Sequence, residues 1–185
     1  MIRHERNIMR VITQTTTNKF LNIKEVTDAE THCKGYQFAE RKGVDSVAFV
    51  GYDANKGRFL LNKEFTPPLG EFLFRAFGGS LDKDKTPEGI VLDEVREEAG
   101  YDVDKEKVYD LGKMFVSTQM NQYCHVFFVD LTGLEFTERQ PENAMEAMGE
   151  PTWMTATQVL LNNDWKAIVI ISRAASEGLI FFLLT

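Results

Sequence analysis

Apolar side chains along this chain alternate with polar ones, or run together, over several short segments. Such runs predict β-strands where turn residues bound them. The predicted strands are Phe20–Val26, His32–Arg41, Asp45–Tyr52, Arg58–Phe65, Glu71–Ala76, Val108–Ser117 and Tyr123–Leu131, with a short last strand at Trp153–Met154. Between two of them, Asp53–Gly57 is a cluster of turn residues, which predicts a hairpin.

Helix signals occur in three places. Thr86 followed by Pro87 is typical of an N-cap with proline at the first helical position, and Gly100 is a typical helix terminator. Two more helices are predicted at Thr155–Leu161 and Asp164–Glu177. The segment Thr137–Glu150 is acidic and Met-rich without clear periodicity, which favours a mobile loop.

Strands on both sides of a central helix, followed by a terminal helix, predict an α/β fold with a mixed sheet packed in a sandwich. The chain has 185 residues, 43% of them apolar, which suits one domain with a well-packed core. No Gly/Pro/Ser-rich linker divides it. We assign residues 45–185 to the main domain and residues 1–44 to an N-terminal arm with strands.

Charge and composition narrow the classes of partner. A net charge of −7 argues against non-specific binding to a nucleic-acid backbone, which needs a basic surface. Cys33 and Cys124 have neither metal-ligand spacing nor disulfide-scaffold density, so free thiols are expected. Met1–Arg10 lacks the apolar core of a signal peptide, and Leu179–Leu184 is far shorter than the roughly 20 residues that span a bilayer. We expect a cytoplasmic protein with no membrane partner.

Three carboxylates stand close together on the central helix. Glu94, Glu97 and Glu98 are spaced i, i+3 and i+4, so in an α-helix they project from one face. Like charges at this spacing cost about 0.2–0.5 kcal/mol per pair. A hard divalent cation among their oxygens would relieve the repulsion. The alternative is a solvated acidic helix face, which is the usual meaning of a Glu-rich helix.

The segment from Gly79 to Tyr101 resembles the Nudix box, the signature of the Nudix hydrolase family. The box reads Gly, five residues, Glu, seven residues, Arg-Glu-U, any residue, Glu-Glu, any residue and Gly-U, where U is a bulky aliphatic residue. The spacing fits without a gap, and the matching residues are Gly79, Glu94, Val95, Glu97, Glu98 and Gly100, with Tyr101 in the last position. Lys85 replaces a glutamate of the signature and Asp93 replaces its arginine, so the box is degenerate.

A looser similarity covers residues 18–178. The strand order, the loop at Phe65–Gly70 and the layout from Trp153 to the C-terminal helix look like the ADP-ribose and nucleoside-diphosphate-sugar pyrophosphatase branch of the family. This resemblance implies an α/β/α sandwich with a mixed sheet and additional N-terminal strands. It implies Mg²⁺- or Mn²⁺-dependent cleavage of the pyrophosphate in a nucleoside diphosphate linked to another moiety. It also implies a homodimer paired through residues 18–41.

The resemblance assigns roles to individual side chains. The metal ligands would be Glu94, Glu97, Glu98 and the carbonyl of Gly78. In related pyrophosphatases a glutamate in a loop well beyond the box takes the proton from water, and Glu146 lies in that position here. The alternative bases are Glu142 and Glu150 in the same loop, and Glu97 or Glu98 on the helix.

Two cations are candidates for substrate binding. Lys63 lies where the branch often carries arginines after a strand, and Arg75 lies just before the box. Arg75 either contacts a phosphate or only caps a strand edge. ADP-ribose as the substrate follows from the branch and not from these residues.

The two departures from the signature have opposite charges. Lys85 and Asp93 could keep the contact between loop and helix with its polarity inverted, which places the Lys85 ammonium within about 6 Å of the Asp93 carboxylate. Asp93 cannot orient the neighbouring glutamates as the family arginine does. A competing interpretation is therefore a catalytically weak or inactive Nudix domain that binds a nucleotide as a sensor or interaction module.

Overall fold

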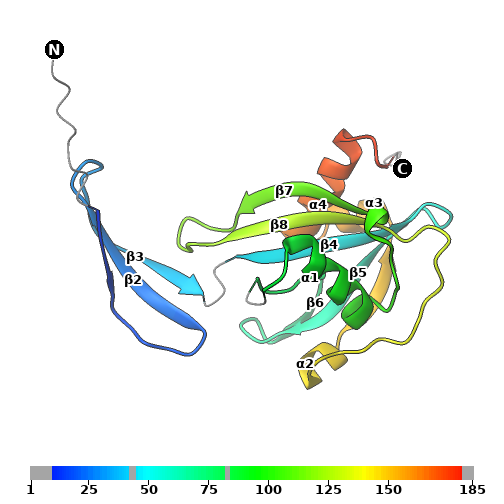
Figure 1. The fold of residues 1–185 in the computed structure, drawn as a ribbon, viewed down its shortest axis with the longest axis horizontal. Helices are drawn as coiled ribbons and strands as arrows, with labels where there is room; N and C mark the ends of the chain where they lie inside the picture. The colour runs from blue at the N-terminus through cyan, green and yellow to red at the C-terminus, as the bar shows by residue number, and fades with distance from the viewer. Residues whose placement is uncertain (1–9, 42–44, 82–83, 181–185) are drawn as a thin grey trace, which may run out of the picture.

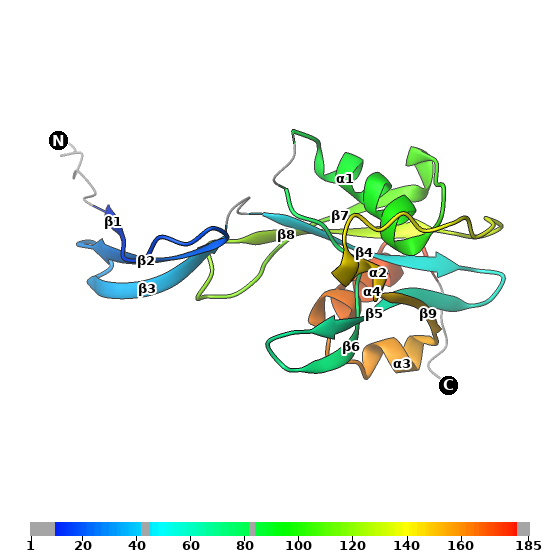
Figure 2. The same cartoon turned by 90° about the horizontal axis from the view of Figure 1, so that it is seen from below.

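The computed structural model describes residues 10–41, 45–81 and 84–180, and these form two separate sheets. The smaller sheet is antiparallel, with β1 (Arg10–Gln14), β2 (Leu21–Asp28) and β3 (Cys33–Arg41) in sequence order. Figures 1 and 2 both show it standing to one side of the main domain. Backbone hydrogen bonds between Ala39 and the loop at Gln119 and Asn121 join the two parts.

The larger sheet is mixed, and its order is β6-β5-β4-β8-β7, with β9 paired to β5. Its strands are β4 (Ser46–Asp53), β5 (Arg58–Thr66), β6 (Glu71–Arg75), β7 (Val108–Phe115), β8 (Tyr123–Asp130) and β9 (Glu150–Met154). The central pair β4 and β8 is parallel and the other pairs are antiparallel. The first strand of this sheet is the most buried, since seven of the eight residues of β4 are buried.

Helices cover both faces of this sheet (Figure 2). The helices are α1 (Pro87–Glu94), a π-helical turn (Val95–Ala99), a 3₁₀ turn (Lys105–Lys107), α2 (Ala144–Ala147), α3 (Ala156–Leu160) and α4 (Trp165–Ser176). Because side chains alternate along a strand, Phe49 of β4 packs with Val91 and Val95 under α1, while Ala48 packs with Ile170 under α4. The predicted α/β/α sandwich with a mixed sheet and N-terminal strands is confirmed.

The predicted strands all occur, with ends shifted by a few residues. Two features differ from the sequence prediction. The α-helical spacing assumed for the three glutamates ends at Glu94, because the backbone then widens into the π-helical turn. The segment predicted as a mobile loop contains α2, whose N-cap Asn143 accepts hydrogen bonds from the N–H groups of Met145 and Glu146. None of the helices in the described ranges is long and apolar enough to cross a bilayer.

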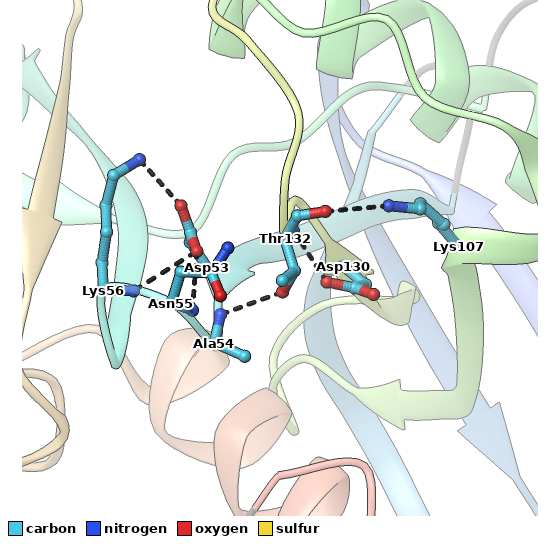
Figure 3. Close-up of polar contacts among 7 residues, drawn as sticks. All are labelled: Asp53, Ala54, Asn55, Lys56, Lys107, Asp130 and Thr132. Atoms are coloured by element: carbon cyan, nitrogen blue, oxygen red, sulfur yellow. Dashed lines mark hydrogen bonds and ion pairs between the residues drawn. The ribbon is translucent and has the colours of Figure 1, made fainter.

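The hairpin between β4 and β5 is held by a polar network at the end of the sheet (Figure 3). The buried Asp53 carboxylate accepts hydrogen bonds from the N–H groups of Asn55 (2.9 Å) and Lys56 (3.3 Å) and pairs with the Lys56 ammonium at 2.8 Å. The Ala54 N–H donates to the Thr132 hydroxyl at 2.9 Å, which ties the hairpin to the loop after β8. Every charge in this network has a nearby partner, so the network stabilises the turn.

Candidate active site

The helix of the box begins as predicted. The Thr86 hydroxyl accepts a hydrogen bond from the Gly89 N–H at 3.1 Å, and Pro87 follows at the first helical position. The Lys85 ammonium lies 2.5 Å from the Asp93 carboxylate. The reversed charge pair is therefore formed, as the sequence predicted, and both side chains are partly exposed to solvent.

The end of the same helix lies against the segment that precedes α2. Gly100 takes the left-handed conformation (φ 77°), and its N–H and that of Tyr101 both donate to the Val95 carbonyl. Carbonyls at a helix C-terminus lack partners within the helix. Here the Thr137 N–H donates to the Gly100 carbonyl (2.8 Å) and the Gln140 N–H to that of Glu97 (3.0 Å).

Arg139 makes the most extensive contact between these two segments. Its Nε donates to the Glu98 carbonyl at 2.6 Å, while its Nη1 and Nη2 donate to the carbonyls of Gly149 (2.5 Å) and Glu146 (2.8 Å). The sequence prediction did not include this residue. The one sequence feature that could have drawn attention to it is that Arg139 is the single basic residue between Glu135 and Glu150.

Glu98 is the most buried of the three helix carboxylates, with only 6% of its surface exposed. Glu94 and Glu97 are half-buried. The Glu94 carboxylate lies over Gly79, where a Cβ would come within 2.2 Å of Glu94 Oε1. The first glycine of the box is thus needed for close approach of this carboxylate.

The electrostatic environment of Glu98 is negative. Burial raises the pKa of the Glu98 carboxyl to about 8, and repulsion from Glu94, Glu64 and Glu146 adds to the shift, while Arg139 opposes it. Carboxylates from the helix, from β5 and from the loop before β9 therefore converge on one place. A buried carboxyl with a pKa near neutrality is typical of functional sites.

Glu64 joins this cluster although the sequence prediction missed it. It forms an ion pair with Arg75 on the adjacent strand β6 and lies next to the buried Asn62, whose Nδ2 donates to Glu64 Oε2 at 3.4 Å. Leu60, Asn62 and Glu64 occupy alternate positions of β5 and so share one face. The sequence carries no spacing signal that links Glu64 to the helix of the box.

A pocket of about 170 Å³ opens beside the cluster. Its basic lining residues are Arg41, Arg75 and Lys166, and its lining also includes Glu64, Gly78 and Gly79. Arg41 at the end of β3 donates to the Ser80 hydroxyl at 2.9 Å, so the N-terminal sheet contributes to this pocket. Lys63 is not among the lining residues; it faces the other side of β5 and lies 3.7 Å from Glu150.

The loop carboxylates have different surroundings. Glu146 Oε2 accepts a hydrogen bond from the Glu142 N–H at 2.7 Å, and Glu146 Oε1 accepts one from the Asn143 side chain. Glu142 and Glu150 are exposed. Among the three candidates from this loop, only Glu146 is near enough to raise the pKa of Glu98.

The donor set suits a hard cation. No group of three or more His, Cys, Asp or Glu side chains within the described ranges is close enough to hold a metal ion as these side chains stand. The nearby donors are nevertheless carboxylate oxygens, together with the buried Asn62 Oδ1, which has no hydrogen-bond partner among the described residues. The carbonyls of Phe77 and Gly79 bond to β4, and strand alternation turns the intervening Gly78 carbonyl away from that strand. Such oxygens are the ligands that Mg²⁺ prefers.

Comparison with known proteins agrees with this geometry. The family described as NUDIX domain matches residues 43–173. A solved structure titled "Crystal structure of ADP compounds hydrolase" superposes with a TM-score of 0.69 at 11% sequence identity, covering 94% of this chain and 96% of that one. No curated protein matches the chain. The family match spans well over half of the sequence, so this chain belongs to the Nudix hydrolase family.

Proposed function

We propose that this Nudix hydrolase cleaves the pyrophosphate of a nucleoside diphosphate linked to another moiety, of the ADP-ribose or nucleotide-sugar type. One observation carries the proposal: the carboxylates around Glu98 lie beside a pocket lined by three cations, Arg41, Arg75 and Lys166. The cations suit the phosphates of an anionic substrate, and the carboxylates suit a divalent metal. The similar fold of the solved structure titled as an ADP compounds hydrolase supports the same substrate class.

The metal would be Mg²⁺ or Mn²⁺, held by Glu94, Glu97, Glu98 and the Gly78 carbonyl. When bound, such an ion neutralises phosphate charge and lowers the pKa of an attacking water. Gly79 allows Glu94 to lie close to the loop before the helix, and Arg75 is kept in place by its ion pair with Glu64. Arg75 then contacts a phosphate from the rim of the pocket.

Glu146 is our candidate for the general base. Its carboxylate accepts hydrogen bonds from the Glu142 N–H and the Asn143 side chain, which hold it in one orientation, and it lies close enough to Glu98 to influence that carboxyl. Replacing Glu146 by Gln should lower turnover about 10²–10⁴-fold, the usual worth of a positioned base. Unchanged turnover would exclude this residue. The same substitution at Glu142 tests the alternative base, and at the exposed Glu138 it serves as the control.

A substrate panel tests the proposed function directly. ADP-ribose, NADH, sugar nucleotides, diadenosine polyphosphates and capped RNA are incubated with the protein and either Mg²⁺ or Mn²⁺, and released nucleoside monophosphate is measured. We expect release from ADP-ribose or a sugar nucleotide, and none when EDTA removes the metal. No release from any compound would contradict the proposal and favour a nucleotide-binding sensor.

We also propose that residues 1–44 form a dimerisation element. In the described part of the N-terminal sheet only Val26 is a buried apolar residue. Val11, Ile12, Phe20, Leu21 and Tyr36 are exposed. A three-stranded sheet needs a covered apolar face for stability, and a second copy of the chain would supply one. Light scattering should then give twice the mass of the 21.1-kDa chain, and a monomer at micromolar concentration would contradict this.

A further inference from the structure

The helix of the box lacks the arginine of the family signature. Asp93 stands in the arginine position and pairs with Lys85 near the surface. Arg96 is the only basic residue of Pro87–Ala99, and it donates to the carboxylate of the exposed Asp102 at 3.3 Å. Neither of these basic side chains is engaged with the buried carboxylate of Glu98.

Arg139 brings a guanidinium to the same helix from a different segment. Three of its nitrogens donate to three carbonyls, those of Glu98, Glu146 and Gly149. Two of these residues carry the carboxylates assigned above as metal ligand and general base. A planar guanidinium can bridge several acceptors at once, whereas a lysine ammonium acts as a single point of charge.

The loop that carries Glu146 packs closely against strand β5. Gly149 is buried against Asn62 of β5, where a Cβ would come within 2.7 Å of Asn62 Oδ1. Asn62 in turn donates to Glu64, a member of the carboxylate cluster. The contacts of Arg139 therefore lie where the helix, the loop and β5 meet.

We propose that Arg139 is a positioning residue that holds the Glu146 loop against the helix of Glu94, Glu97 and Glu98. The role in turnover rests on the proposed function; the structural link between loop and helix does not. Arg139 touches no substrate in this scheme. It sets the distance between the proton acceptor and the phosphate-binding side of the site.

The test compares R139A, R139K and the control R96A, which removes an exposed arginine on the same helix. Misplacement of a catalytic group by about 1 Å can cost about 10²-fold in rate. We expect R139A to lose about that factor in kcat with KM little changed, and R96A to keep wild-type values. R139K should stay at least about tenfold below wild type, because one ammonium cannot bridge the three carbonyls. Guanidinium ions at millimolar concentration should restore part of the kcat of R139A.

Hydrogen exchange supplies a readout that does not depend on a substrate. The Gln140 and Gly149 amides should exchange faster in R139A than in wild type or R96A, since both amides lie in the segment that Arg139 holds. If no substrate is found but this exchange increases, the proposed function fails and the structural link between loop and helix stands. If the wild type is active and R139A keeps its kcat and its exchange rates, the positioning role is wrong. Should R139A fail to fold, R139K decides by the same two measurements.

Discussion

Asp53 and Glu98 are both carboxylates in the interior of this protein, with 4% and 6% of their surfaces exposed, but their surroundings are opposite. At Asp53 burial alone would raise the pKa, yet the ammonium and N–H of Lys56 and the N–H of Asn55 lower it overall. At Glu98 burial and three neighbouring carboxylates raise the pKa to about 8, with Arg139 as the opposing cation. The first carboxylate stabilises the fold as it stands. The second is stabilised only by a proton or a cation.

The difference separates a structural charge from a functional one. Asp53 ends strand β4 and Glu98 lies in the π-helical turn after α1, but both are buried, so burial alone would not distinguish them. What distinguishes them is whether the negative charge already has its partners within the chain. Four experiments can break or sharpen this comparison.

The largest effect is expected for E98Q. Removing this carboxylate should lower turnover about 10²–10⁴-fold, as expected for a positioned acid–base or ligand group. At the same time the metal-free variant should melt at a higher temperature than wild type at pH 9, because a buried, repelled charge is gone. Steady-state kinetics and calorimetry with EDTA measure the two effects. A lower melting temperature at pH 9 would show that Glu98 is a stabilising charge like Asp53.

The second prediction concerns pH and metal. The pKa of Glu98 is raised in the folded state, so its favourable contribution is complete below its ordinary value of 4.5 and is lost as the pH rises through about 8. Melting temperature in EDTA should therefore fall over that range. Metal at a hundred times its Kd at pH 8 should add about 2.7 kcal/mol of stability. The same metal concentration should add less at pH 6, because the proton competes with the ion. E98Q is the matched control and should lack this part of the pH dependence.

D53N tests the other side of the comparison. The amide cannot pair with the Lys56 ammonium, and we expect a loss of about 1–3 kcal/mol in the free energy of unfolding at pH 7. The pKa of Asp53 is lowered in the folded state, so this difference should be present above its ordinary value of 3.8 and shrink as the pH falls below it. Denaturant unfolding at pH 7 and pH 3 measures the effect. Turnover should not change, since this hairpin lies at the other end of the sheet from the pocket.

The smallest effect is expected for the Lys85–Asp93 pair. Both side chains are partly exposed, so K85E alone or D93R alone should cost only about 0.2–1 kcal/mol of stability. The double variant K85E/D93R restores an ion pair with the polarity of the family signature and should recover that loss. Equal stability of all three variants would mean that the pair contributes nothing. The kcat of the double variant, compared with wild type, then shows whether an arginine at position 93 increases turnover when Arg139 is also present.

Much of the fold could be predicted from local pattern. Alternation identified the strands, the Thr86-Pro87 signal located the start of α1, and the charge reversal predicted the contact between Lys85 and Asp93, which are eight residues apart. These features depend on residues close in sequence. The π-helical turn was not predicted, because it depends on how Val95 accepts from two N–H groups at the left-handed Gly100.

The site residues that the sequence did not predict are brought in by contacts between segments distant in sequence. Arg139 lies 41 residues from Glu98, and Glu64 is on a strand before the box. Neither residue carries a spacing signal relative to the helix. Their roles depend on the pairing of β5 with β6 and β9 and on the seating of the loop, which are set by packing in three dimensions.

Arg139 binds main-chain carbonyls, and every amino acid carries one. The anchor is therefore indifferent to the side chains between Gln140 and Gly149, provided that Arg139 and Gly149 stay in place. Apart from the candidate base Glu146, this segment can change its sequence while its attachment is preserved. Loops from other family members that keep a glutamate at this position could therefore be grafted between Arg139 and Gly149.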